Sequence, residues 1–284
     1  MAIYVTSDAH GHVRALDEAL SKISLTSDDT LYVLGDMIDR GPDPVGVIKL
    51  VRSLPNAHVL KGNHEQIMLD AIIGQDPLDA ETWDINGGWT TREQLNDMEF
   101  DAYEELVRWM AALPLYAVAE TEERPYLLVH AGIEMKAARA FLLEHGVDCA
   151  DGVGAVGADR ELLQQMLAVQ SADDLLWIRH GYWDAPTGLL SAEGKGPVVV
   201  SGHTPRCRSG VIARSVVLRG SMRSRAAGRS CAWVARIPPA CPIASISTAP
   251  PPPAPSSAAS GSCGSMMGRS STRTSTRANN RCKW

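Results

Sequence analysis

Three segments near the start of the chain repeat one pattern, in which a short apolar run leads through a polar loop into a helix-like segment. The apolar runs lie at residues 3–5, 31–34 and 58–60. Apolar residues then recur at helical spacing in 13–23 and 42–54. Strands joined by crossovers of this length pair in parallel. The pattern therefore predicts a β-α-β-α-β unit whose loops meet at one edge of a sheet.

The pattern changes after residue 65. Residues 66–113 are mostly helical and acidic, and we expect them to form a cap packed over one side of the sheet. Further strands are expected at 126–129 and 197–201, with a helical excursion between them. We therefore predict an α/β fold with one domain over residues 1–205. The tryptophans of the cap are interpreted as packing residues: Trp83, Trp89 and Trp109.

The last part of the chain has a different composition. Residues 206–284 contain 13 of the 27 Lys and Arg residues, no Asp or Glu, and a run of four prolines. Such a segment buries too little apolar surface to offset the entropy of ordering. We therefore expect a low-complexity basic tail that is disordered, apart from a short strand around residues 216–218. We interpret it as translation in a shifted reading frame, and the alternative is a genuine basic arm that binds nucleic acid.

Composition limits the remaining classes of protein. The apolar fraction of 45% is ordinary for a globular domain. No apolar run approaches the ~18 residues of a membrane span, and no basic leader precedes the first strand. Five of the six cysteines lie in the tail without CxxC spacing, which argues against a zinc site built on cysteine. We expect a cytoplasmic monomer with no membrane or nucleic-acid partner.

Six ligand-type side chains directly follow strand-like runs of the chain. A single histidine in such a place is more often structural, but six ligand types at successive strand ends favour a metal site. Two divalent ions ~4 Å apart need a shared carboxylate and two or three further ligands each. A mixture of carboxylate, amide and imidazole suits Mn, Fe or Zn rather than Ca. We expect two ligand sets that share Asp36: Asp8 and His10 complete the first, and Asn63, His130 and His203 complete the second.

Four further residues have chemistry that fits a phosphate at such a site. A guanidinium group binds two phosphate oxygens at once, which makes Arg40 and Arg179 candidate clamps, although spacing alone leaves Arg179 open as a surface arginine. His64 is expected beside the metals without binding them, free to protonate a leaving oxygen, with Asp39 orienting it. We therefore expect these four residues to be catalytic, with both arginines and Asn63 also contacting the substrate.

Five motifs occur in order along the chain: SDAHG at 7–11, GDMIDRG at 35–41, GNHE at 62–65, HAG at 130–132 and GHTP at 202–205. This set resembles the calcineurin-like metallophosphoesterases, and more narrowly the bacterial and phage-type serine/threonine phosphoprotein phosphatases. Their motifs read GDxHG, GDxxDRG, GNHE, HAG and GHT. The segment Trp177-Ile178-Arg179 also resembles the arginine-bearing segment of that family, which strengthens the assignment of Arg179.

The resemblance covers residues 3–205 and implies a metallophosphoesterase β-sandwich of two mixed sheets flanked by helices. It also implies a dinuclear metal site at the C-terminal ends of the strands, holding manganese in most bacterial members. The implied ligands, clamps and acid pair are the residues given above. The sequence departs from the family after Pro205, where the closing strands of the sandwich have no counterpart, so we expect exposed sheet edges.

Three functions follow from the resemblance. The first is a metal-dependent phosphomonoester hydrolase that acts on phosphoserine or phosphothreonine in a protein or peptide, with a metal-bridging hydroxide as nucleophile. The second is a dinucleoside tetraphosphate hydrolase of the same fold. Such relatives tend to carry GNHD and to lack the aspartate of DRG, so Glu65 and Asp39 favour the protein phosphatase. The third is an inactive metal-binding scaffold.

Overall fold

The computed structural model describes residues 2–74, 76–150, 152–183, 186–204 and 233–237. All of the described residues belong to one compact unit, which spans Met1–Ile243. None of the helices in this part of the chain has the length and hydropathy needed to cross a bilayer.

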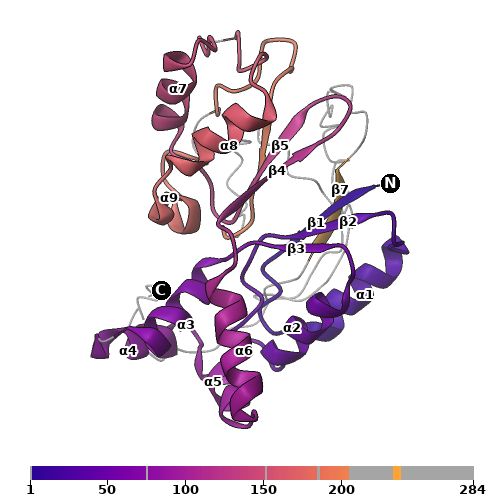
Figure 1. Ribbon diagram of the computed structural model, residues 1–284, viewed down its shortest axis with the longest axis vertical. Helices are drawn as coiled ribbons and strands as arrows, with labels where there is room; N and C mark the ends of the chain where they lie inside the picture. Colours follow the sequence, from indigo (N-terminus) through magenta and orange to yellow (C-terminus); the bar gives the residue numbers. More distant parts are fainter. Residues whose placement is uncertain (1, 75, 151, 184–185, 205–232, 238–284) are drawn as a thin grey trace, which may run out of the picture. The chain divides into compact units, whose positions relative to one another are not determined.

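The first sheet is built from the repeated N-terminal pattern. Strands β1 (Ile3–Ser7), β2 (Thr30–Val33) and β3 (Ala57–Val59) pair in parallel. Helices α1 (Val13–Ile23) and α2 (Pro44–Ser53) connect them, and both pack beside this sheet (Figure 1). Asp43 caps α2 by accepting a hydrogen bond from the backbone of Gly46, with Pro44 in the first helical position. The predicted β-α-β-α-β unit is confirmed.

The other edge of β1 pairs antiparallel with β7 (Trp233–Ile237), which gives the strand order β3-β2-β1-β7. This strand lies beyond residue 205, where we expected the domain to end and no closing strand to follow. Its sequence is rich in aromatic and β-branched residues, which favour strands, and the edge of β1 offers a row of backbone groups to pair with. The other expectations for the tail, including the strand around 216–218, lie outside the described residues.

The second sheet has the order β4-β5-β6. Strand β4 (Tyr116–Glu120) pairs antiparallel with β5 (Pro125–Val129), and β5 pairs in parallel with β6 (Val198–Val200). The sequence analysis did not predict β4, which lies at the edge of this sheet and follows α6 closely. Both sheets are mixed, so the predicted fold is confirmed. Three helices connect β5 to β6: α7 (Met135–Glu144), α8 (Arg160–Ala168) and α9 (Ala172–Trp177).

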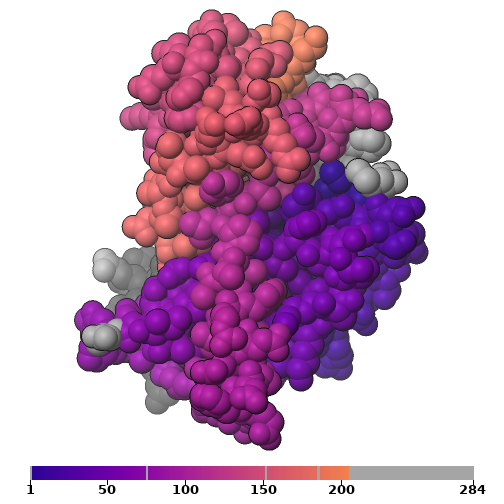
Figure 2. All heavy atoms as spheres, viewed as in Figure 1, coloured from indigo at the N-terminus to yellow at the C-terminus, as the bar shows by residue number. Residues whose placement is uncertain are grey.

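The two sheets pack face to face through apolar side chains. Val5 and Leu34 of the first sheet lie in one buried cluster with Leu128 and Val200 of the second. Because successive side chains of a strand point to opposite faces, Tyr4 lies in a different cluster, between the first sheet and its helices. A third cluster lies between the second sheet and α7 and α8. Figure 2 shows the N-terminal strands and helices and the α7–α8 segment as separate areas of one face.

The predicted cap consists of four helices: α3 (Asn63–Ile73), α4 (Pro77–Ile85), α5 (Trp89–Asn96) and α6 (Phe100–Ala111). They bury Leu95, Leu106 and Met110 in the same cluster as α1 and α2. Trp83 is also buried there, whereas Trp89 is largely exposed. The cap therefore packs on the helix-covered side of the first sheet, and α4 and α5 reach the loops that follow the strands.

Candidate metal centre

The predicted ligands follow the strands and gather at one place. His10 follows β1, Asp36 follows β2, His130 follows β5 and His203 follows β6. Ligand atoms of His10, Asp36 and His64 lie within 4.8 Å of one another, and so do those of Asp36, His130 and His203. Asp36 belongs to both groups, as the sequence predicted for the bridging residue.

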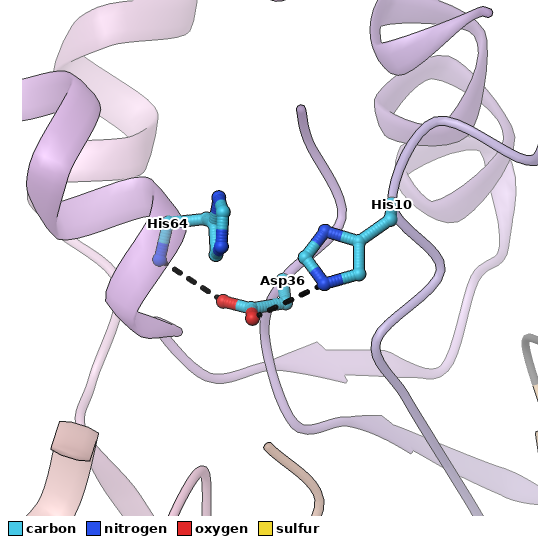
Figure 3. A group of neighbouring side chains, drawn as sticks. All are labelled: His10, Asp36 and His64. Carbon is cyan, nitrogen blue, oxygen red and sulfur yellow. Dashed lines mark hydrogen bonds and ion pairs between the residues drawn. The ribbon is translucent and has the colours of Figure 1, made fainter. Parts of the chain in front are cut away.

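The Asp36 carboxylate lies between the two groups. Its Oδ2 is 3.5 Å from His10 Nε2, and its Oδ1 is 3.5 Å from His130 Nε2. Figure 3 shows the carboxylate between the His10 ring and the backbone of His64, whose N–H donates to Oδ1 over 3.0 Å. Burial, followed by the carboxylates of Asp8 and Glu65, holds the pKa of Asp36 well above its usual range. A bound cation would offset this cost, and a carboxylate with one oxygen toward each group fits a bridging ligand.

Backbone carbonyls set the orientation of two of the imidazole rings. His10 Nδ1 lies 2.9 Å from the carbonyl oxygen of Ile38, and His130 Nδ1 lies 2.7 Å from that of Leu34. A carbonyl can only accept, so each Nδ1 carries the hydrogen and each Nε2 keeps its lone pair. Both lone pairs are therefore available on the side of Asp36, which is how metal-binding histidines are held in proteins.

Two imidazoles of this cluster, those of His10 and His203, are also in the protonation state that binds metals. Burial, with smaller contributions from His64 and Arg40, lowers the pKa of His10 to about 3. Burial, His130 and Arg179 lower the pKa of His203 to about 2. Both rings are neutral at neutral pH, and ligation needs a neutral ring. The donor chemistry thus fits two divalent cations.

Two other predicted ligands differ in how they meet this cluster. Asn63 Oδ1 lies 2.9 Å from His130 Nε2 and 2.9 Å from His203 Nδ1, so it joins the second group. The Asp8 oxygens instead accept hydrogen bonds of 3.1 and 3.0 Å from the backbone of His203. Asp8 thereby joins the loops after β1 and β6, and its role as a ligand stays a prediction.

His64 and Asp39 form the pair that the sequence predicted. His64 Nδ1 donates to Asp39 Oδ2 over 2.7 Å, and both side chains are buried. The Nε2 atom of His64 accepts a hydrogen bond of 2.7 Å from Arg40 Nη2. The distances alone place His64 in the first metal group. However, His64 Nδ1 is hydrogen-bonded to Asp39, which belongs to neither group.

The two predicted arginines lie at different ends of the cluster. Arg40 Nη1 donates to His10 Nε2 over 2.9 Å, beside the first group. Arg179 Nε donates to His203 Nε2 over 3.0 Å, beside the second. Both arginines are exposed, whereas the histidines they contact are buried. A guanidinium therefore stands at the solvent side of each group, where an anionic substrate would arrive.

The backbone of the site is strained. Among the residues that the structure describes, seven non-glycine residues have positive φ, and all except Ser24 are predicted site residues: Asp8, His10, Asp36, Asp39, Arg40 and His203. Each such residue costs about 1–3 kcal/mol and persists only where the surroundings hold it. Gly35, with φ +89, allows the loops after β2 and β3 to touch, since an added Cβ would lie 2.3 Å from Gly62 N. A concentration of such residues in one cluster of polar side chains is typical of a functional site.

The sequence analysis did not predict that three residues hold the site together. Glu65 accepts three hydrogen bonds of 2.8 Å, from the backbone of Asp36, Met37 and Gly62. Thr91 and Trp83 both donate to the Asp39 carboxylate. The signal for Glu65 was its position in the first turn of α3, where an acidic side chain is stabilised. No local signal identified the other two.

The chain resembles known proteins at three levels. The calcineurin-like phosphoesterase family matches residues 1–207. A symmetrical bis(5'-nucleosyl)-tetraphosphatase from Erwinia tasmaniensis is 32% identical over 136 residues, which are 47% of this chain and 45% of that protein. One from Salmonella paratyphi C is 30% identical over 163 residues, 55% of this chain and 50% of that protein.

The chain therefore spans about half the length of the curated relatives it matches. Among solved structures, a protein serine/threonine phosphatase from Saccharomyces cerevisiae is 18% identical. The match covers 66% of this chain and 49% of that chain, with a TM-score of 0.35.

Proposed function

The chain belongs to the calcineurin-like phosphoesterase family, and from that membership we propose that it hydrolyses bis(5'-nucleosyl) tetraphosphates symmetrically. The family makes it a metal-dependent hydrolase, and the substrate is our inference. One observation carries it: the curated relatives named above, at 32% and 30% identity, are symmetrical tetraphosphatases. The arginines support it, because a substrate with several phosphates offers one to Arg40 and another to Arg179.

The sequence favoured a phosphoprotein because of Glu65 and Asp39. Both carboxylates are fully buried. Glu65 is occupied by three backbone N–H groups, and Asp39 by His64, Trp83 and Thr91. Neither Glu65 nor Asp39 is placed to contact a substrate directly, so their identity does not distinguish a phosphoprotein from a dinucleoside tetraphosphate.

The residues of the cluster divide the work of hydrolysis. Two bound divalent ions, which we propose to be manganese, would acidify the attacking water and polarise the phosphoryl oxygen. Arg40 and Arg179 hold phosphate oxygens. His64 holds a proton at Nε2 for the leaving oxygen, while Asp39 accepts from Nδ1 and stabilises the charged ring.

The pKa of His64 bears on this role. Burial and then the Arg40 guanidinium lower the pKa of His64 to about 3, so the ring is neutral before substrate binds. A phosphate bound by Arg40 offsets that positive charge and accepts the N–H that Arg40 otherwise donates to His64 Nε2. Both changes raise the pKa of His64, which favours the protonated ring that the acid role needs.

A phosphoserine or phosphothreonine substrate is the second candidate, and the buried His64–Asp39 pair favours it. An alkoxide is a strongly basic leaving group and needs a general acid, whereas a nucleoside diphosphate leaves from an anhydride with little help. The acid pair is therefore of most use to a phosphomonoesterase.

The test compares kcat/KM for diadenosine tetraphosphate and for a phosphoserine peptide in the presence of Mn²⁺. Symmetrical cleavage consumes one water and releases two molecules of ADP, whereas asymmetrical cleavage releases ATP and AMP. We expect ADP alone, formed at least tenfold more efficiently than phosphate is released from the peptide. Faster release from the peptide would reject the first candidate in favour of the second.

A further inference from the structure

Residues 39–45, which include Asp39 and Arg40, are held by a segment more than 40 positions later in the chain. We name residues 83–94, from the end of α4 through α5, the clamp segment. It makes seven hydrogen bonds to residues 39–45. Trp83 Nε1 donates to Asp39 Oδ1 (3.0 Å) and Oδ2 (3.2 Å), and Thr91 Oγ1 donates to Asp39 Oδ1 (2.6 Å). The backbone N–H groups of Asp39, Arg40 and Val45 donate to Thr91 Oγ1 (2.9 Å), the carbonyl of Gly87 (3.0 Å) and Gln94 Oε1 (2.9 Å), respectively. Gln94 Nε2 donates a seventh, of 3.0 Å, to the carbonyl of Pro42.

The spacing of these residues explains how one segment reaches so many partners. Thr91 and Gln94 are three positions apart in α5, which places them on one face of the helix, and Gly87 lies in the turn that precedes it. Gly87 has φ +94, and an added Cβ would lie 2.9 Å from Arg40 Cγ. Glycine is therefore needed there both for its backbone conformation and for the close approach of the Arg40 side chain.

The contacts at Asp39 account for both of its carboxylate oxygens. Oδ1 accepts from Thr91 and Trp83, and Oδ2 accepts from His64 Nδ1 over 2.7 Å. Trp83 and Thr91 are themselves buried, at 3% and 0% exposure, so no solvent competes for these hydrogen bonds. Asp39 and Arg40 both have φ of 67°. Two consecutive left-handed residues need external contacts to persist, and the clamp segment supplies them.

We propose that Trp83 and Thr91 are positioning residues, which fix the Asp39 carboxylate so that His64 presents Nε2 to the leaving oxygen, and that Gly87 positions the Arg40 guanidinium for phosphate. This inference rests on the proposed role of His64 as general acid. It gives the cap a function beyond packing. It also separates two effects, since Trp83 and Thr91 act on proton donation and Gly87 acts on phosphate binding.

The chain offers matched controls. Thr90 is buried on the same helix as Thr91, and its hydroxyl contacts the carbonyl of Gly87 rather than residues 39–45. Trp109 packs against the same apolar cluster as Trp83. Thr90→Val and Trp109→Phe therefore reproduce the chemical change of Thr91→Val and Trp83→Phe without touching Asp39, and Thr91→Ser keeps the hydroxyl as a rescue.

The kinetic test uses the Mn²⁺-loaded full chain with phenyl phosphate and 4-nitrophenyl phosphate, which differ in leaving-group basicity. We expect Thr91→Val and Trp83→Phe to lower kcat for phenyl phosphate about tenfold more than kcat for 4-nitrophenyl phosphate. His64→Ala should change the ratio of the two kcat values in the same direction. Thr91→Ser and the two controls should keep the native ratio. Gly87→Ala should raise KM for both substrates with the ratio unchanged.

A second readout is independent of turnover. In the protein loaded with diamagnetic Zn²⁺, the proton between His64 Nδ1 and Asp39 gives a proton NMR signal, assigned by its loss in His64→Ala. We expect this signal to move or vanish in Thr91→Val and Trp83→Phe, and to stay in Thr91→Ser and both controls.

The outcomes separate the inference from the mechanism it rests on. If His64→Ala changes the leaving-group ratio while Thr91→Val and Trp83→Phe match their controls in both readouts, the positioning role is wrong and the general acid stands. If His64→Ala leaves the ratio unchanged, His64 is not the acid, and the mechanism and this inference fall together.

Discussion

Replacing Glu65 by aspartate tests whether this residue is structural or sets substrate preference. Its carboxylate accepts three backbone hydrogen bonds of 2.8 Å each, from Asp36, Met37 and Gly62. Aspartate is shorter by one methylene, about 1.5 Å, so it cannot reach all three donors. We expect it to keep one bond and leave two buried N–H groups without their partner.

The magnitude follows from those two losses. A hydrogen bond to a charged group contributes about 1.5–3 kcal/mol, so Glu65→Asp should lower the free energy of unfolding by roughly 3–6 kcal/mol. That is a large part of the ~5–15 kcal/mol that holds a domain folded. At about 2–4 °C per kcal/mol for a domain of this size, the melting temperature should fall by on the order of 10 °C or more.

The assay is thermal unfolding, followed by circular dichroism, together with kcat/KM on diadenosine tetraphosphate and a phosphoserine peptide. The control is Glu93→Asp, an exposed site where the same change should alter stability by less than about 0.5 kcal/mol. We expect Glu65→Asp to lower stability and to leave the ratio of the two kcat/KM values unchanged. A stable variant whose preference moves toward the tetraphosphate would refute the structural role.

Three further outcomes follow from the site. His64→Ala should lower turnover on a phosphoserine peptide by ~10²–10⁴, and loss of bound metal in this variant, measured by mass spectrometry, would show that His64 is a ligand instead. Arg179→Lys keeps the charge but loses the paired donors, so KM for the tetraphosphate should rise about 10-fold or more with kcat little changed; an unchanged KM would remove Arg179 from the phosphate site. Burial raises the pKa of Asp39 to about 6 from 3.8, so its contribution to stability is present below pH 3.8 and is lost as the pH rises through 6. The Asp39→Asn variant should therefore gain ~3 kcal/mol relative to the native chain between pH 4 and pH 7, and parallel pH profiles in chemical denaturation would contradict this.

The positions of the metal-binding residues could be predicted because the sequence next to each of them indicates where it lies. Each ligand-type residue follows its own apolar run, and the ends of such strands meet at one edge of a sheet whatever else the chain does. His10, Asp36, His130 and His203 therefore lie together as the strand pattern predicted. Arg179 has no such local signal: its chemistry made it a candidate, and the resemblance of Trp177-Ile178-Arg179 to a family segment strengthened the assignment.

The contacts that hold the site could not be predicted in the same way. The sequence predicts Trp83 to be a packing residue, and its side chain does pack in the core. The direction of its indole N–H, however, depends on how α4 packs against the loop after β2. The same holds for Thr91, whose partner lies 52 positions away. β4 and β7 were missed; each lies at a sheet edge, where a strand takes its conformation from its neighbour as much as from its own sequence.

The most direct test of a two-ion site shared through Asp36 is the number of Mn²⁺ ions bound per chain, measured by titration calorimetry of the metal-stripped protein. We expect two ions for the native chain, because each Asp36 oxygen faces a different histidine group. Asp36→Ala should bind neither ion tightly. One ion per chain in the native protein, or two in the Asp36→Ala variant, would contradict a dinuclear centre bridged by this residue.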